Sequence, residues 1–159
     1  MNGAAYHLSR AIELDAGLVD AYNNLAQVLL LSGEINSSRE NFLMALKLDQ
    51  KNPLLHENLA NFHLVGDKDF EQARIHFIAA ISNGLDTAGI RFNLGVLMMD
   101  IFKDYRRSLI HFKRCIELNS GDHGAHERLA LIYGKYLEDE NAAKHHTEMA
   151  KKLVELPVA

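Results

Sequence analysis

Small and bulky residues recur along this chain in one helical pattern. Each copy has a small residue, a bulky residue four positions later and a second small residue three positions further on. The five copies are Ala4-Leu8-Ala11, Ser38-Phe42-Ala45, Ala73-Phe77-Ala80, Ser108-Phe112-Cys115 and Ala143-Thr147-Ala150, the last with threonine in the bulky position. Their last members are 34, 35, 35 and 35 residues apart. This period indicates stacked helix hairpins, in which each unit buries its apolar face against its neighbours.

A second pattern, a leucine followed by a small residue, lies between these segments. It occurs at Leu25-Ala26, Leu59-Ala60, Leu94-Gly95 and Leu129-Ala130. A bulky residue beside a small one lets two helices approach closely, so these pairs predict the first helix of each hairpin. The sequence therefore predicts an all-α protein with nine antiparallel helices. They span residues 2–14, 19–31, 35–48, 53–65, 69–83, 88–101, 104–118, 123–136 and 140–155.

The number of residues between the two patterns is constant from one hairpin to the next but varies within the hairpins. From each second helix to the next first helix the step is always 14 residues, as from Ala11 to Leu25. Within a hairpin the step is 20 residues from Leu25 to Ala45 but 21 in the next three hairpins. We expect the additional residue to loop out in the turn inside the hairpin, because that leaves the stacking of hairpins unchanged.

The two end helices differ from the others. Thr147 and Lys151 stand where earlier second helices carry Phe and Leu or Ile, which gives the last helix the polar outer face of a terminal repeat. The helix at 2–14 has no preceding partner, so its apolar strip lacks a covering helix. We expect the chain to be the carboxyl-terminal part of a longer array. We also expect the helix at 2–14 to fray or to self-associate through this strip.

The segment Tyr22-x2-Leu25-Ala26-x2-Leu29, Gly33, Ser38-x3-Phe42-x2-Ala45 resembles the tetratricopeptide repeat, although the proline that often follows the second helix is replaced. The resemblance extends over nearly the whole chain and implies a right-handed superhelix of helix hairpins. It predicts a single array over residues 1–159. Its parts are a lone second helix at 2–15, repeats at 19–52, 53–87 and 88–122, and a terminal repeat at 123–155.

In this family, ligands bind the concave surface lined by the first helices. The residue before each leucine of those helices is expected to face this groove, and these residues are Asn24, Asn58, Asn93 and Arg128. An asparagine amide can pair with both the N–H and the C=O of an extended peptide. The row resembles the asparagine ladder of the O-linked N-acetylglucosamine transferase superhelix. Further candidate contacts are Asn23, Gln27, Asn61 and Phe92.

We therefore expect a protein-interaction scaffold that binds an extended peptide, with several alternatives open. Asparagine is also a common filler at this repeat position, and the chain could be a structural or self-associating segment of a larger enzyme or assembly. A third alternative is the carboxylate clamp by which some family members bind chaperone termini. Asn61, Asn93 and Arg128 match clamp positions, but Glu57 and Gly124 replace its two lysines. This loss of positive charge disfavours gripping carboxylates.

Composition and charge restrict the class of partner. The chain is 48% apolar and 24% charged, which is typical of an ordered protein. Its formal net charge of −4 disfavours nucleic acid and anionic membrane surfaces, and no apolar run approaches the roughly 20 residues of a membrane span. Cys115 is the only cysteine, so no internal disulfide is possible. We expect a cytoplasmic protein with a protein or peptide partner.

Histidines are the remaining candidates for chemistry. His123, His126, His145 and His146 are close in sequence, but no recognised zinc spacing is completed, so we interpret them as packing residues. His63 occupies a core position, and Cys115 fills a small-residue slot where it should be buried and inert. No catalytic motif occurs, and we expect no enzymatic activity, no metal and no cofactor.

Overall fold

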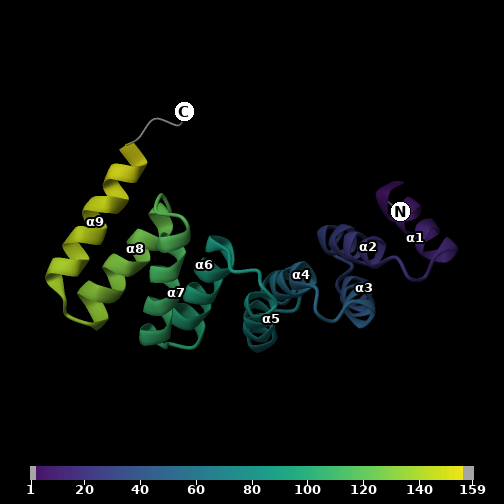
Figure 1. The fold of residues 1–159 in the computed structure, drawn as a ribbon, viewed down its shortest axis with the longest axis horizontal. Helices are drawn as coiled ribbons and strands as arrows, with labels where there is room; N and C mark the ends of the chain where they lie inside the picture. The colour runs from purple at the N-terminus through teal and green to yellow at the C-terminus, as the bar shows by residue number, and fades with distance from the viewer. Residues whose placement is uncertain (1–2, 156–159) are drawn as a thin grey trace. The chain divides into compact units, whose positions relative to one another are not determined.

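The computed structural model describes residues 3–155, which form helices and no strand. The nine predicted helices are confirmed (Figure 1). Two of the first helices end in a π-helical segment. The elements are α1 (Gly3–Leu14), α2 (Val19–Leu31), α3 (Ile35–Leu48), α4 (Pro53–Val65), α5 (Phe70–Ser82), α6 (Ala88–Val96), η1 (Leu97–Ile101), α7 (Tyr105–Leu118), α8 (His123–Leu131), η2 (Ile132–Tyr136) and α9 (Glu140–Glu155). Among them, none is both long and apolar enough to cross a lipid bilayer.

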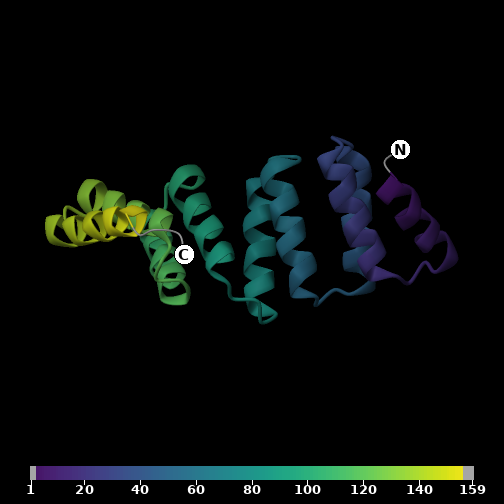
Figure 2. The same ribbon diagram turned by 90° about the horizontal axis from the view of Figure 1, so that it is seen from above.

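The chain divides after Leu85 into two compact units, which are described separately. In the first unit, α2 and α3 form one hairpin, α4 and α5 form the next, and α3 packs against α4. α1 packs against α2. Figure 2 shows α2 to α5 side by side in blue to teal. In the second unit, α6 with η1 pairs with α7, α8 with η2 pairs with α9, and α7 packs against α8.

Side-chain caps begin three of the first helices. The Asn52 side chain accepts hydrogen bonds from the N–H groups of Leu54 and Leu55, and Pro53 occupies the first helical position. Thr87 caps α6 and Asp122 caps α8 in the same way, each accepting one backbone N–H three residues on. These caps satisfy N–H groups of the first turn that the helix itself leaves without partners. They therefore favour a helix that begins directly after the capping residue.

The repeated small and bulky residues form the core. All nine positions of the pattern in α3, α5 and α7 are buried. Two of them are serines, and their hydroxyls donate to carbonyls of the paired first helix. Ser38 Oγ lies 2.8 Å from the Ala26 oxygen, and Ser108 Oγ lies 2.8 Å from the Gly95 oxygen. Burial of these hydroxyls is therefore compensated, since a buried polar group is costly only when it lacks a partner.

The copies of the pattern in the end helices behave differently. Thr147 is exposed, as expected for a terminal repeat. In α1, Ala4 is exposed and Leu8 and Ala11 are half-buried, so this strip is only partly covered in the described part of the chain. The buried residue of α1 is Ala5, which clusters with leucines of α2. A helix with one close neighbour buries the side that faces it, which the repeat pattern alone does not reveal.

The position of the additional residue in the later hairpins corrects one expectation. In the α4–α5 hairpin it lies in the turn, as predicted, since residues 66–69 replace the shorter turn at 32–34. In the other two hairpins it is taken up by η1 and η2. The Phe102 N–H donates to the Leu97 oxygen at 3.0 Å, and the Leu137 N–H donates to the Ile132 oxygen at 3.1 Å. These five-residue steps are π-turns, which absorb one residue without breaking the helix.

Substituting Gly95 by alanine is expected to lower the free energy of unfolding by about 1–3 kcal/mol. A Cβ atom at position 95 would lie 2.7 Å from the Phe112 ring, which is fully buried and has no room to shift. This clash outweighs the roughly 1 kcal/mol by which alanine favours a helix over glycine. Urea denaturation followed by circular dichroism measures the change.

The matched control is Gly89→Ala in the same helix. The nearest atom to a Cβ at position 89 is the Thr87 hydroxyl oxygen at 4.0 Å, so no contact must give way. We expect this variant to unfold at the same or a slightly higher urea concentration. A Gly95→Ala protein that is more stable than the original would contradict the close approach of α6 to Phe112.

Candidate functional site

A groove of about 410 Å³ lies between α2 and α4 in the first unit. It contains three of the residues predicted to face a ligand, Gln27 from α2 and Asn58 and Asn61 from α4. The others that line it are apolar residues of α2, α3 and α4: Leu30, Leu31, Phe42, Phe62, Leu64 and Val65. The groove is thus a polar edge beside an apolar floor, which is the usual composition of a ligand site.

Asparagine amides form the polar edge. Asn58 Nδ2 donates to Asn23 Oδ1 at 2.9 Å, and Asn23 Nδ2 donates to Asn24 Oδ1 at the longer distance of 3.5 Å. A primary amide offers two N–H donors and one oxygen acceptor. The bond to Asn23 therefore uses one donor of Asn58 and orients its amide, which retains the capacity for a donor and an acceptor toward a ligand.

The apolar floor is open to solvent in part. Leu31 is 89% exposed and Val65 is 66% exposed, whereas Leu30 and Leu64 are half-buried. Beneath them the rings of Phe42 and Phe62 pack with their centroids 5.6 Å apart. Exposed apolar side chains gathered over a concave surface mark a binding region more often than single scattered ones do.

Two acidic residues on or just after α4 have shifted pKa values. Glu57 is half-buried beside Asn58 in sequence, and burial raises the pKa of its carboxyl group. Burial alone would also raise the pKa of Asp67, but hydrogen bonds from His63, from the Asp69 N–H and from Arg39 lower it. Glu57 occupies the position of the first lysine in the carboxylate clamp, so the local charge has the wrong sign for that function.

The second unit holds the other candidate residues. Arg128 Nη1 lies 3.4 Å from Asp100 Oδ2 of η1, a long contact between side chains that are both partly exposed. Phe92 is half-buried and packs edge-on against Phe112 at a centroid distance of 5.5 Å. Its role is therefore partly structural. Asn93 is half-buried in α6.

Sequence reasoning missed a row of histidines at one position of the second helices, His76, His111 and His146. Each contacts the residue that stands three positions before the repeated leucine of its own first helix. His76 Nδ1 is 3.0 Å from His56 Nδ1, and His146 Nδ1 is 2.9 Å from His126 Nδ1. His111 instead faces Arg91, with its Nδ1 atom 3.4 Å from Nη1. The regular spacing of 35 residues was the available signal.

The environment of these histidines disfavours their charged form. Burial lowers the pKa of His76 to about 4, and the neighbouring His56 and His63 add to the shift. Burial likewise lowers the pKa of His111 and of His146 to about 4, assisted by Arg91 and by His126 respectively. Neutral rings at pH 7 suit a packing role for these three histidines.

The His56–His76 ring pair in the first unit also contacts the backbone. His56 Nε2 is 3.0 Å from the Gln50 carbonyl oxygen, which can only accept, so this nitrogen carries the proton. When both rings are neutral, His56 Nδ1 accepts from His76 Nδ1–H. Within residues 3–155, no group of three or more His, Cys, Asp or Glu side chains is arranged to hold a metal ion.

Cys115 is buried, as predicted. Its Sγ atom lies 3.4 Å from Asp122 Oδ2. Burial, together with the negative charge of Asp122 and this hydrogen bond, raises the pKa of the thiol to about 12. The reactive thiolate is therefore scarce at neutral pH, and the sulfur serves as a small core group.

One relative has a sequence similar to most of this chain. Human protein O-mannosyl-transferase TMTC3 is 32% identical over 139 residues, which make up 84% of the chain and 15% of that protein. The chain thus spans less than a fifth of its relative's length.

Solved structures share the fold at lower identity. MamA superposes with a TM-score of 0.85 over 97% of the chain and 88% of its own, at 18% identity. YrrB, described as a TPR protein with an unusual peptide-binding site, gives a TM-score of 0.82 over 94% of the chain and 75% of its own, at 21% identity. Residues 19–52, the cleanest copy of the pattern, match the tetratricopeptide repeat family. The family match at residues 19–52, together with the fold and helix pairing of the described residues, shows a tetratricopeptide repeat array.

Proposed function

We propose that this chain is a protein-interaction scaffold that binds an extended peptide along its first helices. The observation that carries the proposal is the groove between α2 and α4, where the Asn58 amide adjoins an apolar floor. YrrB, which has the same fold, is described as having a peptide-binding site, and a peptide ligand is proposed here on the same scaffold. Asn24, Asn93 and Arg128 contribute further backbone contacts, each from its own first helix.

The groove favours a peptide with one bulky apolar side chain. Leu30, Leu31 and Leu64 offer a floor on which a leucine or phenylalanine side chain loses its contact with water. Burying such a side chain contributes about 1.5–3 kcal/mol, and each net hydrogen bond about 0.5–1.5 kcal/mol. A micromolar complex needs about 8 kcal/mol, so the anchor side chain and several amide contacts are all required. Glu57 favours a neutral or basic peptide over an acidic one.

A peptide array followed by calorimetry on the strongest binder tests the proposal. Asn58→Ala is expected to weaken binding about five- to tenfold, because it removes the paired backbone contacts. Val65→Asp is expected to weaken binding of peptides that carry an apolar anchor, and since Val65 is exposed the protein should still fold. Asn141→Ala is the matched control, because Asn141 is an exposed asparagine on α9 and does not line the groove.

The results separate this function from its alternatives. Equal peptide affinities of the Asn58→Ala and Asn141→Ala proteins would show that the asparagine row has no role in binding. Absence of any binder would favour a structural or self-associating segment. That alternative has its own observation, since α1 exposes Tyr6 by 53% and Leu14 by 82%. Sedimentation velocity of a Leu14→Asp variant then shows whether α1 joins two copies.

A further inference from the structure

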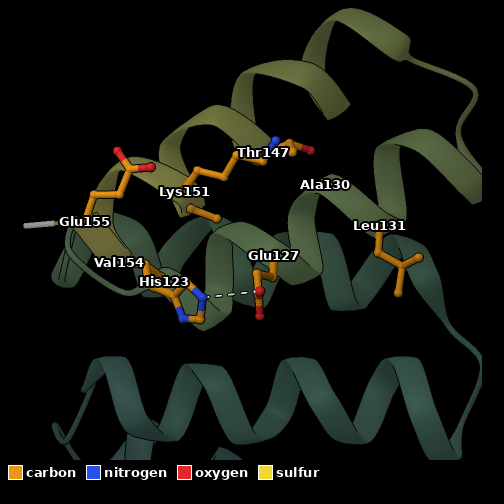
Figure 3. A pocket seen from close by; sticks show the side chains of 9 residues that line it. His123, Glu127, Ala130, Leu131, Thr147, Lys151, Val154 and Glu155 are labelled. Carbon is orange, nitrogen blue, oxygen red and sulfur yellow. Dashed lines mark ion pairs between the residues drawn. The ribbon is translucent and has the colours of Figure 1, made fainter.

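A second groove, of about 600 Å³, lies between α8 and α9 in the second unit (Figure 3). Figure 3 shows the side chains of His123, Glu127 and Leu131 along α8, with Thr147 and Lys151 on the neighbouring α9. Two small residues, Ala130 and Ala150, also line the groove. Asn24, Asn58, Asn93 and Arg128 do not line this groove.

The same face is covered by a helix in the earlier hairpins of both units. In the first unit, Leu59 and Phe62 of α4 cluster with Ala26 and Phe42 of the α2–α3 hairpin. In the second unit, Leu129 of α8 and Ile132 of η2 cluster with Phe112 of α7. The covering helix brings two bulky apolar residues three positions apart in each case. Ala130 and Thr147 of the α8–α9 hairpin occupy the positions of Ala26 and Phe42.

Residues of the α8–α9 groove are correspondingly less buried. Ala130 is half-buried, although its equivalent Ala26 is completely buried. Val154 is 66% exposed and Leu131 is 42% exposed. No described helix covers them.

Two positions of the α8–α9 groove differ from the equivalent positions of the earlier hairpins. Thr147 replaces a phenylalanine, which removes the volume of an aromatic ring. Its hydroxyl donates to the Ala143 oxygen of its own helix at 2.8 Å, so it needs no partner from a ligand. Lys151 replaces the leucine or isoleucine of earlier repeats and has no ion pair among the described residues, whereas His123 and Glu127 pair with each other at 3.2 Å.

We propose that this groove binds a separate amphipathic helix. The helix carries two bulky apolar residues three positions apart, one of them aromatic to fill the space left at Thr147. An acidic residue on the same side of the helix pairs with Lys151. The two covering helices of the chain itself supply the geometry, since they fill the equivalent face with this residue spacing.

The probe is a helix-stabilised synthetic peptide with the sequence of residues 52–65, because α4 covers the equivalent face in the first unit. Fluorescence anisotropy measures its binding to the full chain. Leu131→Asp and Val154→Asp are expected to weaken binding at least tenfold. Both positions are exposed, so these variants should remain folded. Ile110→Asp, at a 62% exposed position on α7 outside the groove, is expected to bind like the original protein.

A variant peptide and further measurements show which results would contradict the proposed helix site. A peptide with aspartate in place of its Leu59 and Phe62 should not bind, and Asn58→Ala in the protein should leave binding of the original peptide unchanged. Equal binding to the Leu131→Asp, Val154→Asp and Ile110→Asp proteins would overturn the proposal. A concentration-dependent dimer that Val154→Asp dissociates, without binding of the peptide to the monomer, would assign the groove to a second copy and overturn it as well.

Discussion

Substituting Phe112 by alanine is expected to lower the free energy of unfolding of the second unit by about 3–5 kcal/mol. The ring is completely buried, contacts Phe92 and lies in the cluster with Cys115 and Leu129. Its removal leaves a cavity that rigid neighbouring helices fill only in part, so lost transfer energy and lost packing add together. Urea denaturation followed by circular dichroism gives the change.

Two further variants show whether buried volume is the cause. Phe112→Leu keeps most of the volume and is expected to cost about 1–1.5 kcal/mol. Ile110→Ala removes a side chain of α7 that is 62% exposed, and its cost should be within about 0.5 kcal/mol. Similar losses for Phe112→Ala and Ile110→Ala would contradict a core centred on the aromatic ring.

Acidification from pH 7 to pH 4 is expected to destabilise the protein through His76, His111 and His146. Their folded-state pKa values are lowered to about 4, below the ordinary value of 6.5. The unfolded chain therefore binds protons first as the pH falls. The contribution of these histidines to the free energy of unfolding is fully present above about pH 6.5. It is lost as the pH falls from 6.5 to 4, at roughly 1–2 kcal/mol for each histidine after allowance for partial exposure.

Carboxylates act in a different pH range. Hydrogen bonds from Arg91 and Arg114 lower the pKa of Asp86 below 3.8, so its contribution is lost only in stronger acid. Burial raises the pKa of Glu57 above 4.5, which opposes the histidine effect. The decline between pH 6.5 and pH 5 therefore reports chiefly on the histidines.

His76→Asn tests this assignment, because Asn41 occupies the equivalent position of the first hairpin. Urea midpoints at pH 7, 5.5 and 4.5 should fall less steeply in this variant than in the original protein. His7→Asn is the control, since His7 is exposed on α1. If the urea midpoint of the His76→Asn protein falls with pH as steeply as that of the original protein, other groups cause the acid sensitivity.

Much of the fold could be predicted because stacked hairpins depend on local contacts. The two patterns of small and bulky residues placed the nine helices that residues 3–155 form. The π-turns could not be predicted, since a residue added in the helix or in the turn gives the same spacing. The helical solution keeps Leu97, Met98 and Met99 buried, and burial is a property of the packed structure.

The candidate site was predictable only in part. Repeat position indicated that Asn58 and Gln27 face one surface, and both line the groove of the first unit. The hydrogen bond from Asn58 to Asn23 depends on side-chain rotamers, which the sequence pattern does not specify. Phe92 contributes to the core more than its repeat position suggested, because Gly124 leaves space beside its ring.

The widened turns at Leu97–Ile101 and Ile132–Tyr136 have a consequence for engineering. Because the backbone takes up an inserted residue locally, hairpins of the shorter and the longer type are expected to be interchangeable parts. A chimera that exchanges one for the other should therefore preserve its junctions, so that binding surfaces can be recombined without redesigning the adjoining modules.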